Sequence, residues 1–455
     1  MLRTNTVKVD PLNTGINLRS INKLAIPATI AGIAEPVLSI TDTAIVGNIP
    51  EFGMESLAAT GIVGSFLSML IWVLGQTRSA ISAIISQYVG ADKKDKILAL
   101  PAQAIFLNIS MSILVLLSTI FIVEEIFVLM NATGKILELC IAYYSIRVWG
   151  FPLTLFVFAV MGIFRGLQNT YYPMLIAITG AVLNIVLDII LVYGIEGYIS
   201  PMYLEGAAWA SLMAQGVMAI MAFVLLITKT DISLALRLPI HPELGRLVVM
   251  SLNLFVRALA LNAAMILAVR EATSLGDRYI GAHTIAINLW LFSAFFIDGY
   301  GAAGNIMGGK LLGARNYNGL WLLAKKITTY GLVVSLGLVT LGFLFYYPIG
   351  RVFSNDPAVL ETFYAIFFIL ILSMPLNMIA FVFDGLFKGL GEMKYLRNVL
   401  LVASFLAFIP LLYLGKYLGW GIYGIWAAFT IWMLIRGGAL VWKFRQKFRP
   451  LLQNV

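Results

Sequence analysis

The chain has 455 residues, of which 60% are hydrophobic and 12% are charged, and its formal net charge is +9. Soluble domains average roughly 45–50% apolar and about 25% charged residues, so this composition excludes a soluble enzyme, a disordered chain and a disulfide scaffold. The single cysteine, Cys140, excludes an intrachain disulfide. Together with only two histidines, His241 and His283, it also excludes a zinc-type ligand cluster.

Long apolar runs follow one another along the whole chain. A hydrocarbon core of roughly 30 Å needs about 20 apolar residues per helix. Barrel strands would be about half as long and would alternate in polarity. We therefore predict an all-α polytopic membrane protein, and the first run is too long for a signal peptide, so no cleaved segment is expected. The twelve predicted spans are Ile21–Ile49, Leu57–Ile85, Pro101–Val123, Ile136–Val160, Pro173–Tyr193, Leu204–Thr228, Leu244–Val269, Tyr279–Met307, Leu322–Tyr346, Val359–Val382, Leu396–Leu414 and Gly421–Trp442.

The basic residues are distributed unevenly between the two sides of the membrane. If the N-terminus lies inside, most of the 31 Lys and Arg residues fall in segments on that same side. This bias is typical of cytoplasmic loops and argues against a nucleic-acid face. We predict a multi-pass protein of the cell membrane with both termini in the cytoplasm and no nucleic-acid partner.

Short motifs recur at one fixed distance. "GIFRGLQ" at Gly162–Gln168 is followed by "GLFKGLG" at Gly385–Gly391, an offset of 223 residues, and "YVGA" from Tyr88 is followed by "LLGA" from Leu311 at the same offset. Six spans return the chain to the side of the membrane on which it began, so both halves cross the membrane in the same direction. We predict two pseudo-symmetric six-helix lobes around a central cavity. The predicted segments are an N-terminal tail at 1–20, an N-lobe at 21–228, a cytoplasmic linker at 229–243, a C-lobe at 244–442 and a cytoplasmic tail at 443–455.

Acidic residues inside the spans are functional candidates, because a charge at the bilayer centre costs roughly 2.5–3.5 kcal/mol. Counted from the outer ends of their spans, Asp42 and Ser211 lie roughly 10 Å deep and Asp188 roughly 7–8 Å deep, so the three share one level. Asn184 lies one turn from Asp188, and Glu35 lies two turns below Asp42 on the same face.

Two readings of this acidic level are possible. Burial and a neighbouring carboxylate both favour the protonated form, so Asp42 and Asp188 are expected to exchange a proton near neutral pH as a coupled pair. Alternatively, hydrogen bonds could hold each Asp as a structural pin. Pro27 and Pro36 each remove a backbone hydrogen bond from the first span, which predicts a kink that is either a moving part or a static bend.

Other charged groups within or near the spans are less specific. Asp298 fits a packing role as well as a functional one, and Asp384 is expected to cap its helix or to pair with Lys388. Three arginines could either neutralise the buried acids or line an anion-tolerant cavity, and the sequence leaves both open: Arg78, Arg147 and Arg257.

The chain resembles the multidrug and toxic compound extrusion (MATE) family. The segments that carry the likeness are "TDTAIVG" (41–47), "FRGLQNTYYPM" (164–174) and "LNIVLDIILVYG" (183–194). The resemblance is closest to the DinF-like branch and implies that Asp42 and Asp188 hold the coupling ion, with Asn184 and Ser211 as neighbours. The NorM-like branch also uses acids in its seventh and tenth helices. Here those spans carry Asn253, Arg257, Asn262 and Asn377 instead, which favours coupling in the N-lobe.

The resemblance implies an antiporter, not an enzyme. It would export amphipathic organic cations in exchange for H⁺, or for Na⁺ held by Asp42, Asp188 and Asn184, with no cofactor and as a monomer. The expected substrate-cavity residues are Arg147, Arg257, Asp298 and Asn377. The alternative is a lipid-linked precursor flippase of the same superfamily, which would need a cationic cavity of the kind that the intramembrane arginines could form. No enzyme motif is present to support a membrane enzyme.

Overall fold

The computed structural model describes residues 15–50, 53–236 and 239–452. The first half contains α1 (Leu18–Gly47), α2 (Gly53–Leu74), α3 (Thr77–Gly90), α4 (Leu100–Ile120), α5 (Val123–Leu129), α6 (Gly134–Arg147), α7 (Gly150–Gly166), α8 (Tyr171–Tyr193) and α9 (Tyr203–Lys229). The second half contains α10 (Pro242–Leu275), α11 (Asp277–Gly313), α12 (Tyr317–Leu344), α13 (Tyr346–Arg351), α14 (Pro357–Gly389), α15 (Met393–Ala403), α16 (Ile409–Tyr417) and α17 (Ile422–Phe448).

The predicted spans are all helical, as they must be where no water can satisfy the backbone. Among the described residues, ten helical segments are long and apolar enough to cross a membrane, and an eleventh is α6 together with α7, which meet at 47°. The 30-residue helix α1 supplies the remaining span. The prediction of twelve transmembrane helices is therefore confirmed. Besides the bend between α6 and α7, two other spans are interrupted in the described residues: α2 ends before α3 begins, and a π-helical turn at Ser404–Phe408 joins α15 to α16.

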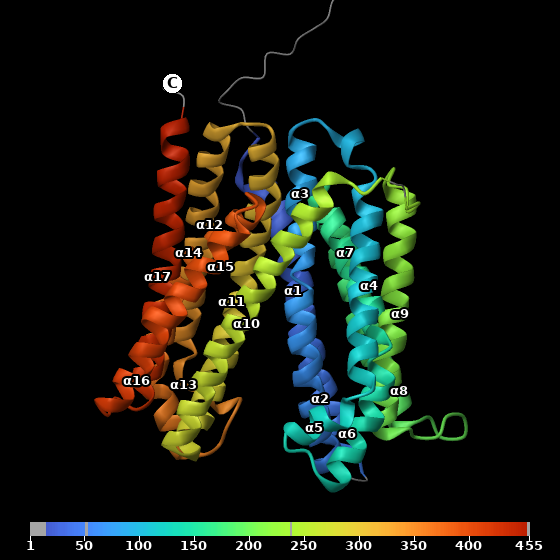
Figure 1. Cartoon of the computed structure of the whole chain (residues 1–455). Coiled ribbons are helices and arrows are strands. Elements are labelled where there is room, and N and C mark those ends of the chain that lie inside the picture. Colours follow the sequence, from blue (N-terminus) through green and yellow to red (C-terminus); the bar gives the residue numbers. More distant parts are fainter. Residues whose placement is uncertain (1–14, 51–52, 237–238, 453–455) are drawn as a thin grey trace, which may run out of the picture.

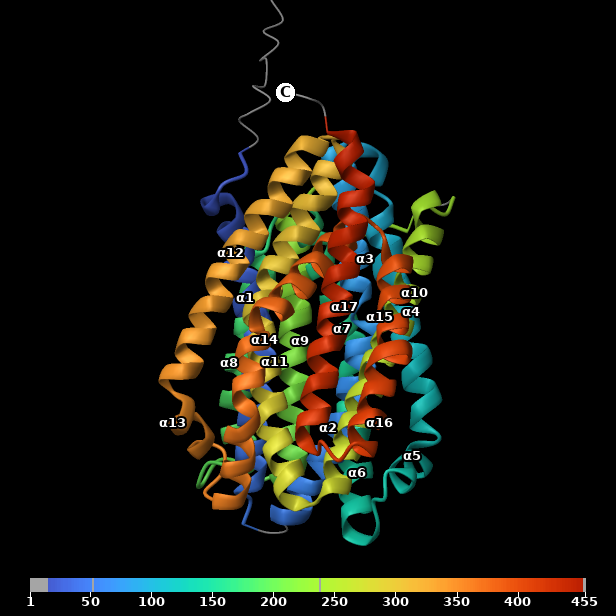
Figure 2. The ribbon, with the colours of Figure 1, turned by 90° about the vertical axis from the view of Figure 1, so that its left-hand side faces the viewer.

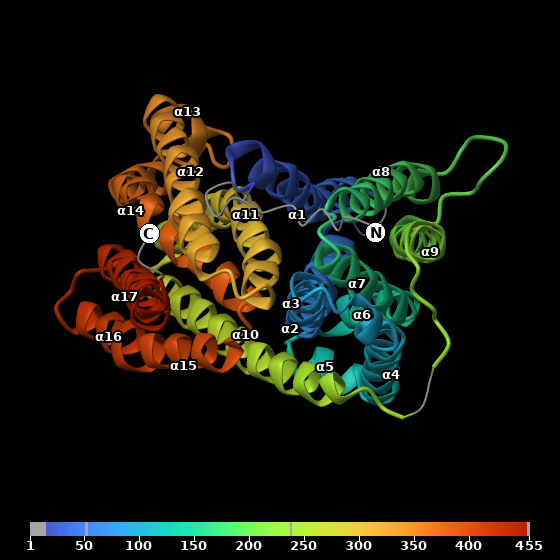
Figure 3. The same ribbon diagram turned by 90° about the horizontal axis from the view of Figure 1, so that it is seen from above.

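The helices form two lobes. Helices α1 to α9 make up the N-lobe and α10 to α17 the C-lobe, and the two groups stand side by side when seen from above (Figure 3). α1 begins and α17 ends at the same end of the bundle, which we call the terminal end (Figure 2). Across the boundary α11 packs against α1 and α3. The two groups of helices diverge away from the terminal end (Figure 1). The residue limits predicted for the lobes, linker and tails stay predictions.

The buried apolar side chains follow this arrangement. The largest cluster joins residues of both lobes, among them Ile81 and Phe164 of the N-lobe and Ile306 and Leu386 of the C-lobe. Two smaller clusters each belong to one lobe. Because lipid tails are as apolar as these side chains, close van der Waals packing and inter-helix hydrogen bonds hold the lobes together on the terminal side, while each lobe has its own cluster at the opposite end.

A hydrogen bond links positions that the repeat makes equivalent. Ser82 of α3 donates from its Oγ to Oδ1 of Asn305 in α11 at 3.0 Å, and the two residues are 223 positions apart. A contact between equivalent residues must lie on the axis that relates the two lobes. The predicted parallel repeat is thus visible as a pseudo-two-fold axis between α3 and α11.

The same axis relates two glycines at which the lobes approach most closely. A β-carbon added at Gly90 would collide with the backbone of Lys310, and one added at Gly313 would collide with the backbone of Gln87. The two contacts are equivalent in the repeat, because adding 223 to Gly90 and Gln87 gives Gly313 and Lys310. Small residues let helix backbones meet in a membrane, which explains glycine at both positions.

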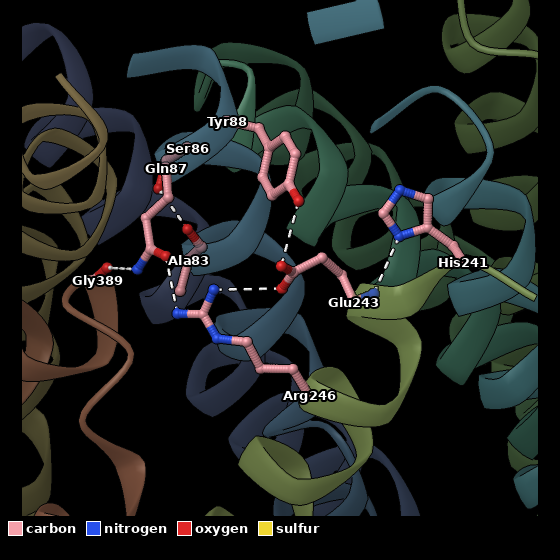
Figure 4. A network of polar contacts seen from close by, with 8 residues as sticks. All are labelled: Ala83, Ser86, Gln87, Tyr88, His241, Glu243, Arg246 and Gly389. Carbon is pink, nitrogen blue, oxygen red and sulfur yellow. Dashed lines mark hydrogen bonds and ion pairs between the residues drawn. The ribbon is translucent and has the colours of Figure 1, made fainter. Parts of the chain in front are cut away.

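A polar network covers this junction at the terminal end (Figure 4). Gln87 of α3 donates from Nε2 to the carbonyl of Gly389 in α14 at 2.8 Å and accepts from Nη2 of Arg246 in α10 at 2.8 Å. Arg246 also donates to Glu243 at 3.2 Å, and Glu243 accepts from the hydroxyl of Tyr88 at 3.2 Å. The network joins one helix of the N-lobe to two helices of the C-lobe, so its bonds must break for the lobes to part at this end.

The pairing of Ser82 with Asn305 makes a direct test of the closed junction. In a background in which the only native cysteine, buried Cys140, is replaced by Ala, Ser82→Cys with Asn305→Cys should form a disulfide on mild oxidation and stop transport until reduced. Gel mobility after proteolysis between the lobes measures the crosslink. Each single cysteine variant serves as control, and failure of the double variant to crosslink would contradict the described junction.

The role of the polar network is testable in the same background. Gln87→Leu removes both inter-lobe hydrogen bonds while keeping the side-chain volume, so the closed arrangement should be less populated and the disulfide should form severalfold more slowly. The matched control is Gln446→Leu, at an exposed position on α17. An unchanged crosslinking rate would show that packing alone closes the junction.

Candidate functional site

Three helices of the N-lobe bring the predicted polar residues together. α1 carries Asp42, α8 carries Asn184 and Asp188, and α9 carries Ser211. The four-residue spacing of Asn184 and Asp188 places both on one face of α8. The hydroxyl of Tyr193, near the end of α8, donates to the carbonyl of Ile45 at 2.7 Å and ties α8 to α1 close to Asp42.

The side chains of this site are buried in the lobe. Asp188 is 0% exposed, Asn184 1% and Ser211 3%. The carboxyl groups of Asp42 and Asp188 lie within hydrogen-bonding reach of each other. Nδ2 of Asn184 donates to Oγ of Ser211 at 3.4 Å. The structure thus brings four of the residues predicted from the sequence into one place.

Four buried oxygens at this site lack a donor. Among the described residues, none donates a hydrogen bond to Oδ1 of Asp42, to either carboxylate oxygen of Asp188 or to Oδ1 of Asn184. Leaving a buried acceptor unpaired costs about 1–3 kcal/mol, and more for a charged group. An arrangement of orphan oxygens is stable when a proton or a small cation occupies it, because carboxylate and carbonyl oxygens are the ligands that hard cations prefer.

One basic and one phenolic side chain of α6 surround the acidic pair. Arg147 and Tyr143 interact electrostatically with both carboxyl groups. The Arg147 guanidinium lies 5.8 Å from the centre of the Tyr143 ring. Arg147 therefore offsets part of the negative charge of the pair, but it forms no ion pair within 4.0 Å in the described part of the chain.

Asp42 of the acidic pair borders a cavity inside the N-lobe, with a volume of about 500 Å³. Asp42, Asn184 and Ser211 line it together with Tyr143 and Arg147. Its apolar lining is formed by Leu38, Leu67, Ile71, Val157, Phe158, Met161 and Met218. A substrate in this cavity would touch both apolar side chains and the carboxyl group of Asp42.

A second cavity, of about 230 Å³, lies between the lobes. It shares Ile71, Arg78 and Phe158 with the N-lobe cavity, so the two are neighbours. Trp72, Trp290 and Phe295 give it aromatic surface. Its charged lining is predominantly basic and consists of Arg78, Arg165, Arg257, Lys388 and Arg436 against Asp298 and Asp384.

The basic groups on the C-lobe side gather around one carboxylate. Asp384 pairs with Arg257 and, at 3.0 Å, with Lys388. The predicted pairing of Asp384 with Lys388 is confirmed, but the pair lines the cavity between the lobes and not only the helix end. Arg436, which is 3% exposed, lies 4.8 Å from the ring centre of Trp432.

The other predicted residues are distributed as follows. Arg257 and Asp298 line the inter-lobe cavity, whereas Arg147 lines the N-lobe cavity. Asn377 is buried in α14, donates to Ser373 at 3.2 Å and lines neither cavity. Pro27 lies inside α1, which continues through it. The side chains of Glu35 and Pro36 fall outside the described residues.

Three basic residues of the inter-lobe cavity were not predicted to line it: Arg165, Lys388 and Arg436. A signal for two of them was present in the repeat, because Arg165 and Lys388 occupy the same position in "GIFRGLQ" and "GLFKGLG". Equivalent residues of two lobes that face one axis line the same cavity. For Arg436 the available signal was its position inside the predicted span Gly421–Trp442, where a basic residue is unusual.

A transition-metal site is not evident. Within the described ranges no group of three or more His, Cys, Asp or Glu side chains could hold a metal ion. Asp42, Asp188 and Asn184 each present an unpaired oxygen atom that could bind a small hard cation.

Comparisons with known proteins agree with this architecture. The MatE family model matches residues 27–190 and 254–414. DNA damage-inducible protein F of Escherichia coli is 25% identical over 448 residues, covering 94% of this chain and 92% of that protein. Protein DETOXIFICATION 43 of Arabidopsis thaliana is 30% identical over 299 residues, which cover 65% of this chain but only 54% of that longer protein. A probable multidrug resistance protein NorM of Mannheimia succiniciproducens is 24% identical and covers 94% of this chain and 93% of its own length.

The fold is also that of solved transporters. A crystal structure of MATE in complex with MaD3S superposes with a TM-score of 0.87 at 22% identity, covering 95% of this chain and 96% of that one. Two six-helix lobes, a repeat axis at their junction and a family match over both halves lead to one conclusion: the chain belongs to the MatE family of multidrug and toxin efflux transporters, and is a multi-pass membrane protein and not an enzyme.

Proposed function

We propose that the protein is a secondary active antiporter in which Asp42 and Asp188 together hold the coupling ion. The observation that carries this proposal is the group of four donor-less oxygens of Asp42, Asp188 and Asn184, buried beside the N-lobe cavity. Two carboxylates in one low-dielectric site cannot both stay charged without a counter-ion. Uptake and release of one cation by this site is therefore the step that drives transport.

The position of Asp42 supports coupling to a substrate. It lines the N-lobe cavity, while Asp188 behind it is fully buried. When the pair gains a cation, the charge and hydrogen bonding of the cavity wall change at Asp42. A substrate that binds the two states with different affinity is then linked to the ion, as antiport requires.

We propose the proton as the coupling ion, with Na⁺ as the alternative. A proton shared by two adjacent carboxyl groups needs no further ligands. Na⁺ would recruit Oδ1 of Asn184 as a third oxygen. Both ions satisfy the same atoms, so the choice is left to a measurement in which the two gradients are applied separately.

We further propose a plasma-membrane location with the terminal end in the cytoplasm, as the distribution of Lys and Arg favours. The polar network and the largest apolar cluster close that end, so the described conformation faces outward. A single copy would suffice, because one chain supplies both the ion site and both walls of the inter-lobe cavity.

The two cavities favour different substrate classes. Amphipathic organic cations, which the sequence favours, would fit the aromatic and methionine lining of the N-lobe cavity. The basic lining of the inter-lobe cavity instead favours the second candidate function, the flipping of a lipid-linked precursor through its pyrophosphate group. Transport of a labelled lipid across proteoliposomes would distinguish the flippase from an exporter of soluble molecules.

Neutralising the first aspartate tests the proposed coupling without any assumed substrate. In proteoliposomes on a solid support, a pH jump should produce a transient current from proton binding in the wild type, and Asp42→Asn should abolish it. The matched control, Asp277→Asn at an exposed position of α11, should keep the current. A normal current in Asp42→Asn would remove this residue from the coupling step, and a sodium jump run in parallel identifies the ion.

Asp188→Asn separates a shared site from a single titrating acid. If the two carboxyl groups share a proton, removing one charge leaves Asp42 without its neighbour and displaces the pH midpoint of the transient current. A shared site predicts a midpoint clearly different from that of the wild type. An unchanged midpoint and amplitude would make Asp188 a structural residue, with purification as a folded, monodisperse protein as the check on stability.

A further inference from the structure

A groove runs along the outer surface of the C-lobe between α14 and α17. These two helices pack against each other on the side of the C-lobe that lies away from the N-lobe (Figure 3). The groove has a volume of about 370 Å³ and is lined by Leu376 and Ile379 of α14 and by residues of α17 between Met433 and Arg445. Among the described residues, none that lines this groove also lines either of the two cavities above.

Two adjacent glycines of α17 shape the groove. A β-carbon added at Gly437 would lie 3.4 Å from the backbone nitrogen of Ala380, so α17 rests on α14 at this point. A β-carbon added at Gly438 would meet no atom within 4 Å, so this glycine borders open space and not a helix contact. Leu434, one turn earlier, is 52% exposed, and both helices are long and apolar enough to cross a membrane. The groove therefore opens toward the lipid.

A hydrocarbon chain is the occupant that a bilayer offers to such a groove. Apart from Arg445, the lining residues in the described part of the chain are apolar or aromatic. A lipid chain in the groove contacts the protein on several sides, whereas a chain on a convex helix surface contacts it on one side. Because van der Waals attraction adds up over such contacts, the groove binds a chain more tightly than the rest of the lipid-facing surface does.

The groove has a positively charged end, which lies toward the terminal end of the bundle. Arg445 follows Gly438 by seven residues, so roughly 10 Å of helix separates them. In the described part of the chain, Arg445 forms no ion pair within 4.0 Å. Trp442, one turn before Arg445, is 62% exposed, and tryptophan is enriched at the level of the lipid headgroups. A lipid whose chain lies in the groove therefore places its headgroup beside Arg445.

The basic residues around Arg445 favour a headgroup with a net negative charge. Lys443, Lys447 and Arg449 all lie within four residues of it. Lys447 already pairs with Glu392, whereas the side chain of Arg445 is exposed. A guanidinium group binds a phosphate through two parallel hydrogen bonds, and basic residues next to a membrane helix attract anionic lipids. Charge complementarity thus selects an anionic phospholipid over a zwitterionic one.

We propose that the groove between α14 and α17 binds one anionic phospholipid from the leaflet at the terminal end. An acyl chain lies against Leu434 and Gly438, and the phosphate pairs with Arg445. Elsewhere on their surfaces α14 and α17 carry Asp384 and Arg436, which line the inter-lobe cavity. The lipid therefore stabilises the packing of two helices that form a wall of that cavity. This inference goes beyond the proposed function, and the binding requires neither a coupling ion nor a substrate.

Native mass spectrometry of the purified full chain measures this binding. The probes are phosphatidylglycerol and phosphatidylcholine with identical acyl chains, each titrated separately. We expect the first molecule of phosphatidylglycerol to bind about fivefold more tightly than the first molecule of phosphatidylcholine, because Arg445 and its basic neighbours attract the anionic headgroup. Phosphatidylglycerol with a photoreactive diazirine in its acyl chain should label α17 between Leu434 and Trp442 after illumination.

Variants of Arg445 test the headgroup contact. Arg445→Gln should weaken binding of phosphatidylglycerol by about fivefold, close to the affinity for phosphatidylcholine, because one positive charge at the headgroup is lost. Arg445→Lys keeps this charge and should retain most of the preference. The matched control is Arg19→Gln, at an exposed position near the start of α1 and at the same end of the bundle, and it should bind both lipids like the wild type.

A change at Gly438 tests the groove itself. Gly438→Leu fills part of it and should weaken binding of both lipids and reduce photolabelling of α17. The matched control is Gly337→Leu on α12, at another exposed glycine whose β-carbon would meet no atom within 4 Å, and it should leave binding unchanged. Arg445→Gln alters only an exposed side chain, so it tests the proposal even if Gly438→Leu does not fold.

Four outcomes would overturn the proposal. The first is equal affinity of the wild type for the two lipids, and the second is an unchanged preference in Arg445→Gln. The third is photolabelling outside the groove. The fourth is a dimer in the wild-type spectrum that Gly438→Leu abolishes, because it would assign the groove to a second copy of the chain.

Discussion

A carboxylate in an apolar interior is stable only when it is neutralised, and the N-lobe buries two of them within hydrogen-bonding reach of each other. The surrounding helices offer no donor to three of the carboxylate oxygens among the described residues. The proposed role of the pair, to bind and release a cation, rests on these unpaired oxygens. The hydrogen bond from Tyr193 to Ile45 ties α8 to α1 near this pair, and Asp42 and Arg147 line the N-lobe cavity. A cation bound by the pair would therefore change the charge of the cavity wall.

The repeat determines where the molecule can move. Equivalent residues meet at Ser82 and Asn305, and glycines on both sides of the axis let α3 and α11 touch. This contact, the apolar cluster and the network around Gln87 all lie on the terminal side, while each lobe has its own core at the other end. If the two lobes rock as rigid bodies about this axis during the proposed transport, these inter-lobe contacts on the terminal side must break. The basic residues that line the inter-lobe cavity also come from both lobes.

Most of the fold could be predicted from the sequence for two reasons. The thickness of the bilayer sets the length of each span, and the lack of water in its core requires every backbone polar group to be hydrogen-bonded within a helix. The breaks between α2 and α3 and between α6 and α7 could not, since they leave the apolar composition unchanged. Depth along a helix follows from residue counting, which is why Asp42, Asp188 and Ser211 were expected at one level. The direction in which a side chain faces depends on how helices pack. For that reason Asp384 was expected only as a partner of Lys388, and the joint basic lining formed by Arg165, Lys388 and Arg436 was missed.

We propose that Asp42 and Asp188 share one exchangeable cation. Infrared difference spectroscopy of the protein in lipid during a pH step observes a protonated carboxyl group directly through its carbonyl stretching band. If the two residues share a proton, we expect one such band that is lost as the pH rises and is absent from the Asp42→Asn, Asp188→Asn double variant. If sodium is the ion, adding Na⁺ at constant pH should displace the same band. If the wild-type protein shows no carboxyl band that responds to pH or to sodium, Asp42 and Asp188 do not share an exchangeable cation.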